Sequence, residues 1–161
     1  MKTTKKRMVE NMSKLKIAII NGPNINTLGK REGSVYGTVC WSEIENRLKA
    51  LGMQLDVELM FFQSNHEGDI VDFIQCNMDE LGGVIINPAA FSKVGYSILD
   101  ALNSKSTPFV EVHLTNIVSR GGWHSESIFT EGAIGMVMGF KGFVYDMGLN
   151  AMYNYLKENL V

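Results

Sequence analysis

Cysteine and proline are scarce in this sequence, which has two and three of them among its 161 residues. Two cysteines cannot form the disulfide framework that holds small secreted domains together. Cys40 and Cys76 are also too far apart in the sequence to be a close-spaced pair of metal ligands. We therefore expect both to be reduced thiols in a cytoplasmic protein.

A strong charge of one sign and a long apolar run are missing as well. The formal net charge is -2, so the chain has no basic field that would attract nucleic acid or an anionic membrane surface. No apolar run approaches the roughly 20 residues needed to span a bilayer, and no apolar segment of a signal peptide follows the basic N-terminal residues. We expect no nucleic-acid or membrane partner, and one domain over residues 14–161 after a mobile tail over residues 1–13.

The apolar residues that are present gather in short runs that alternate with segments of helical spacing. The runs predict strands at Leu15–Ile20, Leu55–Phe62, Gly83–Ile86, Phe109–Val112 and Ile134–Met138. The spacing predicts helices at Trp41–Leu51, Gly68–Met78, Tyr96–Leu102 and Gly142–Leu156, with Ser64 and Asn65 as candidate caps of the second. This alternation is typical of repeated βαβ units and predicts an α/β fold, a three-layer flavodoxin-like sandwich with a five-stranded parallel sheet.

Three loops of this fold are expected to meet at one edge of the sheet. They follow the first, third and fourth strands and span Asn21–Tyr36, Asn87–Lys93 and His113–Ser127. In open α/β sheets, ligands bind at the carboxyl ends of the strands. Because these loops contain nearly all of the polar residues of interest, we predict that the ligand site lies there.

Arg31 and Tyr36 form the first pair of candidate site residues. They lie five residues apart in the first loop, where Gly33 and Gly37 provide backbone freedom. A permanent cation near a phenol favours its ionised form, so Tyr36 could act as a base in proton abstraction. The alternative interpretation is an ordinary surface loop.

Glu111 and His113 form the second pair. They end the fourth expected strand, where alternation places both side chains on the same face. A carboxylate can orient an imidazole, and a positioned, protonated histidine is a natural general acid. A histidine at a strand end is also often structural, so both interpretations stay open here.

Asn24, Asn87 and Arg120 are further candidates for ligand binding. The two amides suit the recognition of a hydroxyl or an enolate, although asparagine also serves routinely in turns. Arg120 follows His113 in the same loop and could bind an anion, or it could be a solvated surface charge.

Motifs for metals and nucleotides are absent. His66, His113 and His124 have no recognised metal-ligand spacing, and the acidic residues near them are not clustered. The glycine patterns that bind dinucleotides and nucleoside triphosphates do not occur either. We expect no metal and no organic cofactor; a flavin is allowed by the fold alone, which is a weak argument.

The motifs resemble those of one known family. They are Asn21–Asn24, Arg31–Glu32, Tyr36–Gly37, Gln63–Gly68, Ile86–Pro88 and Glu111–Ile117. In this order, from about Leu15 to the final helix, the chain resembles type II 3-dehydroquinate dehydratase. The resemblance implies a flavodoxin-like fold, no cofactor, a homo-oligomer built from trimers and commonly a homododecamer, and a small cyclic carboxylate as substrate. It implies the conversion of 3-dehydroquinate to 3-dehydroshikimate in the shikimate pathway of aromatic amino acid biosynthesis.

The resemblance also implies catalytic roles. Tyr36 would remove a proton from the carbon beside the ketone, with Arg31 and Arg120 lowering its proton affinity. Asn24 would help to hold the water that stabilises the resulting enolate. His113, oriented by Glu111, would protonate the departing hydroxyl in an anti elimination.

The remaining roles implied by the resemblance concern substrate binding. Asn87, Leu114 and Thr115 would hold the hydroxyl and the carboxylate of the substrate. Asp100 would correspond to an acidic residue that reaches the site of a neighbouring subunit.

Two positions depart from the family pattern. Lys93 stands where the family has a substrate-binding histidine, and His124 stands where it has a second, hydroxyl-binding arginine. Lys93 could replace the histidine as a donor, or its ammonium could point to water. Two alternatives therefore stay open: a divergent homologue that dehydrates a different cyclic β-hydroxy ketone, and a non-catalytic binding module.

Overall fold

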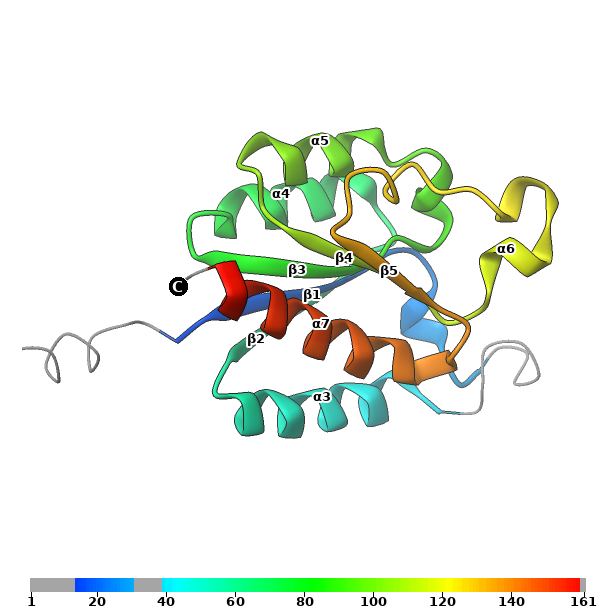
Figure 1. Ribbon diagram of the computed structural model, residues 1–161. Coiled ribbons are helices and arrows are strands. Elements are labelled where there is room, and N and C mark those ends of the chain that lie inside the picture. Colours follow the sequence, from blue (N-terminus) through cyan, green and yellow to red (C-terminus); the bar gives the residue numbers. More distant parts are fainter. Residues whose placement is uncertain (1–13, 31–38, 160–161) are drawn as a thin grey trace, which may run out of the picture.

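The computed structural model describes residues 14–30 and 39–159, which build one parallel sheet of five strands in the order β2-β1-β3-β4-β5 (Figure 1). The strands are β1 (Lys16–Asn21), β2 (Glu58–Gln63), β3 (Leu81–Asn87), β4 (Phe109–His113) and β5 (Gly135–Met138). This sheet confirms the predicted α/β fold class. The strand order reverses between β1 and β3, which is the position where ligands bind in doubly wound sheets.

Helices cover both faces of the sheet. The α-helices are α3 (Trp41–Leu55), α4 (Glu67–Asn77), α5 (Tyr96–Ser104), α6 (Ile117–Arg120) and α7 (Val144–Asn159). Short 3-10 turns are η1 (Ile25–Thr27), η2 (Ala89–Lys93), η3 (Gly122–His124) and η4 (Lys141–Phe143). α3 and α7 lie on one face, α4 and α5 on the other, and α6 lies beyond the carboxyl ends of the strands (Figure 1). Among the described residues, no helix is long and apolar enough to cross a membrane.

The central strands are apolar on both faces because both faces are covered. Along β1, Ile17 and Ile19 pack into the core beneath α3 and α7, while Ala18 and Ile20 pack into the core beneath α4 and α5. Side chains alternate along a strand, so a strand buried on both sides reads as a continuous apolar run. This is why short apolar runs located the strands.

The boundary between α3 and β2 differs from the prediction. Leu55 is the last residue of α3, not the first of a strand, and Asp56 ends the helix in the left-handed region with φ 54°. β2 then begins at Glu58. Leu55 packs against the core as a helical residue, so its apolar character did not distinguish the two elements.

The predicted caps of α4 are also wrong. The residue before the helix is His66, which makes no side-chain capping hydrogen bond. Ser64 Oγ instead accepts from the backbone N–H of His66 at 2.9 Å, and Asn65 Oδ1 accepts from the N–H of Asn24 at 2.9 Å. Asn65 therefore ties the loop after β2 to the loop after β1.

The pairing of β1 with β3 continues past the ends of the strands. Asn21 lies opposite Asn87 in the register, and the next N–H, that of Gly22, donates to the carbonyl of Asn87 at 2.8 Å. The first residues of the two loops are consequently held side by side.

Candidate functional site

A cavity of about 250 Å³ lies at the carboxyl ends of the strands. It is lined by eight of the predicted site residues: Asn24, Asn87, Lys93, His113, Leu114, Thr115, Arg120 and His124. They come from the loops after β1, β3 and β4, so the predicted meeting of these loops is confirmed. The volume is below the about 300–1,000 Å³ of drug-sized ligand sites, which favours a small ligand.

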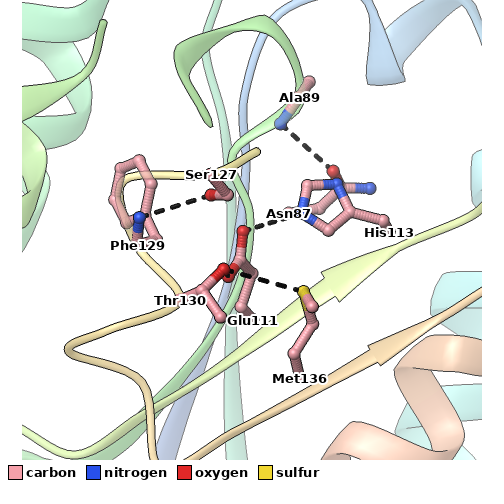
Figure 2. Close-up of polar contacts among 8 residues, drawn as sticks. All are labelled: Asn87, Ala89, Glu111, His113, Ser127, Phe129, Thr130 and Met136. Atoms are coloured by element: carbon pink, nitrogen blue, oxygen red, sulfur yellow. Dashed lines mark hydrogen bonds and ion pairs between the residues drawn. The ribbon is translucent and has the colours of Figure 1, made fainter. Parts of the chain in front are cut away.

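His113 is oriented by a buried carboxylate. Its Nε2 lies 2.7 Å from Glu111 Oε1, and the other carboxylate oxygen, Oε2, accepts a hydrogen bond of 2.7 Å from the hydroxyl of Thr130 (Figure 2). Glu111 is fully buried behind His113, which lines the cavity. With Nε2 engaged, Nδ1 is the ring nitrogen left for a ligand.

The environment of Glu111 favours its ionised form. Burial by itself would raise the pKa of the carboxyl, but hydrogen bonds with His113, Ser127 and Thr130 outweigh burial and hold the pKa below its ordinary value. The carboxylate is thus a fixed negative charge against the imidazole. Such a charge fixes the ring orientation that a proton donor needs.

Removing the Thr130 hydroxyl should change how stability depends on pH. At present the folded pKa of Glu111 is lowered, so its stabilising contribution is present above the unfolded pKa and is lost as the pH falls through the folded pKa. Thr130→Val raises that folded pKa. We expect a loss of about 1–3 kcal/mol at neutral pH and a shallower decline below about pH 5. Urea unfolding at several pH values measures both; an unchanged acid slope would contradict the expectation.

Asn87 both stabilises a turn and lines the cavity. Its Oδ1 accepts from the backbone N–H of Ala89 at 3.2 Å (Figure 2), and its Nδ2 donates to the hydroxyl of Tyr145 at 2.9 Å. One Nδ2 hydrogen and one Oδ1 lone pair remain for a ligand. Tyr145 was not predicted as its partner; the only general signal is that a buried phenol needs a hydrogen bond.

Asn24 lies in the left-handed region of the backbone, with φ 69°. Asparagine tolerates this conformation better than most residues. Its N–H is held by Asn65, and its carbonyl accepts from the N–H of Thr27 at 3.1 Å. The turn by itself explains why an asparagine stands at this position. Asn24 also lines the cavity, so the predicted binding role is compatible with its location.

Lys93 does not point to water. Its Nζ is buried and has no hydrogen-bond partner among the described residues. Burial lowers the pKa of the ammonium, although the charges of Glu126 and Glu111 oppose this. A buried ammonium without an acceptor is costly, so a ligand that supplies an acceptor oxygen would be favoured here.

His124 lies beside Trp123, with ring centroids 3.8 Å apart, and both line the cavity. Burial, then the positive charges of Arg120 and Lys93, lower the pKa of His124. The residue is therefore a neutral donor or acceptor near pH 7, in contrast to a permanently charged arginine.

Asp100 is exposed on α5 and does not line the cavity. Arg31 and Tyr36, the predicted cation and base, lie outside the described residues. Arg120, by contrast, ends α6 at the cavity with an exposed side chain.

The fold and the site together define a class of protein. A doubly wound α/β sheet carries, at its switch point, a small cavity with a carboxylate-oriented histidine, amides and nitrogen donors. This is an open α/β protein with a small ligand cavity at its switch point, lined by a histidine of the kind that can act as a general acid.

Comparison with known proteins identifies the family. The family model "Dehydroquinase class II" matches residues 15–153. A 3-dehydroquinate dehydratase of Prochlorococcus marinus is 44% identical over 144 residues, which cover 89% of this chain and 99% of that protein. One of Endomicrobium trichonymphae is 47% identical over 132 residues, covering 81% and 92%. The crystal structure of type II dehydroquinase from Butyrivibrio crossotus has a TM-score of 0.84 at 34% identity, covering 88% and 99%. The chain belongs to the class II dehydroquinase family.

Proposed function

We propose that this protein is a 3-dehydroquinate dehydratase, a hydro-lyase that eliminates water from 3-dehydroquinate to give 3-dehydroshikimate. The observation that carries the proposal is the pair of His113 and Glu111, 2.7 Å apart, on the wall of a small cavity. The elimination needs a proton donor for the departing hydroxyl. His113 can serve as this donor through Nδ1.

The reaction proceeds in two proton transfers. Tyr36, whose proton affinity Arg31 and Arg120 lower, takes the proton from the carbon beside the ketone and leaves an enolate. Asn24 helps to hold the water that stabilises the enolate oxygen. The electrons of the enolate then form the ring double bond and expel the β-hydroxyl, which leaves as water with a proton from His113. Solvent returns the proton from Tyr36 to His113, so one water is lost overall.

Substrate binding follows from the remaining lining residues. Asn87 offers one hydrogen and one lone pair to a hydroxyl, and the backbone at Leu114 and Thr115 meets the carboxylate at the start of the loop after β4. The protein acts in the cytoplasm as a homo-oligomer built from trimers. Exposed Asp100 reaches the site of a neighbouring copy.

The direct test is turnover of 3-dehydroquinate. The product is a conjugated enone, so its ultraviolet absorbance reports the rate. We expect turnover by the wild type and its near abolition in Tyr36→Phe, with the fold intact by circular dichroism. Binding without turnover by folded wild-type protein would instead favour the binding module, and an undiminished rate in Tyr36→Phe would refute the assignment of the base.

Lys93 offers a further prediction, because its removal should move affinity and stability in opposite directions. Lys93→Met takes away a donor to the substrate, and we expect KM to rise about 10- to 100-fold, the equivalent of about 1–3 kcal/mol. The same change removes a buried ammonium that has no hydrogen-bond partner in the part of the chain that the structure describes, so the free energy of unfolding should increase. The matched control is Lys105→Met, an exposed lysine that directly follows the C-terminal end of α5 and does not line the cavity, which should leave KM unchanged. A KM unchanged in Lys93→Met would contradict the binding role.

A second candidate is dehydration of a different cyclic β-hydroxy ketone. It rests on the two departures from the family pattern, Lys93 and His124, both of which line the cavity. The double variant Lys93→His, His124→Arg tests it. A large gain in turnover of 3-dehydroquinate would support the second candidate, and no gain would count against these positions as determinants of specificity.

A further inference from the structure

Tyr145 on α7 is a buried polar residue that the catalytic roles above do not use. It is fully buried, and its hydroxyl lies between two asparagines at the carboxyl ends of neighbouring strands. The hydroxyl donates to Asn21 Oδ1 at 2.7 Å and accepts from Asn87 Nδ2 at 2.9 Å. Tyr145 does not line the cavity, but Asn87 does.

Ala89, Asn87, Tyr145 and Asn21 are joined by a series of three hydrogen bonds. The backbone N–H of Ala89 fixes the direction of all three. The N–H of Ala89 can only donate, so Asn87 must present Oδ1 to it and Nδ2 to Tyr145. With its oxygen accepting from Asn87, the phenol donates its hydrogen to Asn21. Because the phenol donates, Asn21 must turn its Oδ1 toward it. It does so although its own buried Nδ2 then has no partner among the described residues.

We infer that Tyr145 is a positioning residue for substrate binding, which holds the amide of Asn87 in one rotamer and one polarity. This inference rests on the proposed function, in which Asn87 contacts the substrate. The hydroxyl takes one hydrogen of Nδ2, and the second hydrogen is left in a defined direction. Without the hydroxyl, the amide of Asn87 keeps only the contact with Ala89 and can rotate.

The ring of Tyr145 is held independently of its hydroxyl. Trp41 packs against it in an edge-to-face arrangement with centroids 5.3 Å apart, and the ring belongs to the core beneath α3 and α7. Burial also raises the pKa of the phenol, so the hydroxyl stays protonated and able to donate at every pH at which the protein is assayed. Tyr145→Phe therefore removes the hydrogen bonds with little change in packing.

The test is a double-mutant cycle on steady-state kinetics with 3-dehydroquinate. We expect Tyr145→Phe to raise KM about tenfold with kcat changed less than about threefold. In an Asn87→Ala background the same substitution should have no further effect on KM, because the side-chain amide through which Tyr145 acts on the substrate is absent. A merely structural role would lower the amount of active enzyme, which reduces the apparent kcat instead, and its effect would persist in that background. Tyr153→Phe on the same helix, where Lys157 lies over the ring, is the control and should change neither constant.

Absence of turnover by the wild type would refute the proposed function, and this inference with it, whereas normal wild-type turnover with an unchanged KM in Tyr145→Phe would refute the inference alone. If Tyr145→Phe does not fold, Asn21→Ala removes only the acceptor of the phenol hydrogen. That variant should weaken the hydrogen bond between Tyr145 and Asn87 and so raise the hydrogen-exchange rate of the Asn87 side-chain amide, measured by NMR. An unchanged exchange rate would overturn the inference.

Discussion

Replacing His113 by glutamine is expected to lower kcat for 3-dehydroquinate about 10²- to 10⁴-fold, the range for loss of a general acid. Glutamine is chosen because its Nε2 can still donate to Glu111, whose carboxylate is fully buried and would otherwise lose that partner. An amide cannot donate a proton to a leaving hydroxyl. KM should change much less than kcat, since the lost interaction matters in the transition state.

The control for this substitution is His66→Gln. His66 is exposed at the start of α4 and does not line the cavity, so kcat should stay at the wild-type value. If His113→Gln retained kcat within about threefold, the histidine would be structural, and the leaving hydroxyl would need another donor. Parallel measurement of the unfolding midpoint separates this outcome from a loss of folded protein.

Most of the fold could be predicted because the strands are buried on both faces. A run such as Ile17–Ile20 needs apolar residues toward α3 and α7 as well as toward α4 and α5, and this pattern is visible in the sequence. The start of β2 could not be predicted in the same way. Leu55 is apolar but lies in a helix. The residue that ends this helix in the left-handed region is Asp56, not the glycine that usually marks such an end.

The site could be predicted where its residues are close in sequence. Glu111 and His113 lie two apart on one strand, so alternation alone brings them together. Thr130 and Tyr145 were missed because they reach Glu111 and Asn87 across 19 and 58 residues. The burial of Lys93 likewise depends on how the three loops pack against one another.

Gly22 lies against the backbone of the loop after β3. A Cβ at this position would lie 2.3 Å from the carbonyl oxygen and 2.8 Å from the carbonyl carbon of Pro88. Both atoms belong to the backbone, so no side-chain rotation can relieve the overlap. The loops would have to separate, which would break the hydrogen bond from Gly22 to the carbonyl of Asn87.

Gly22→Ala is therefore expected to lower the free energy of unfolding by about 3 kcal/mol, at the upper end for an overpacked site, and the melting temperature by about 6–12 °C. The matched control is Gly68→Ala in the first turn of α4, where the new Cβ would have no heavy atom within 4 Å. Both substitutions reduce the freedom of the unfolded chain equally, so the difference between them isolates the contact with Pro88. Urea unfolding of the two variants measures it. Because Asn87 would move with the strand ends, the folded fraction of Gly22→Ala should also show a raised KM; equal stability of the two variants would mean that the loops can separate without cost.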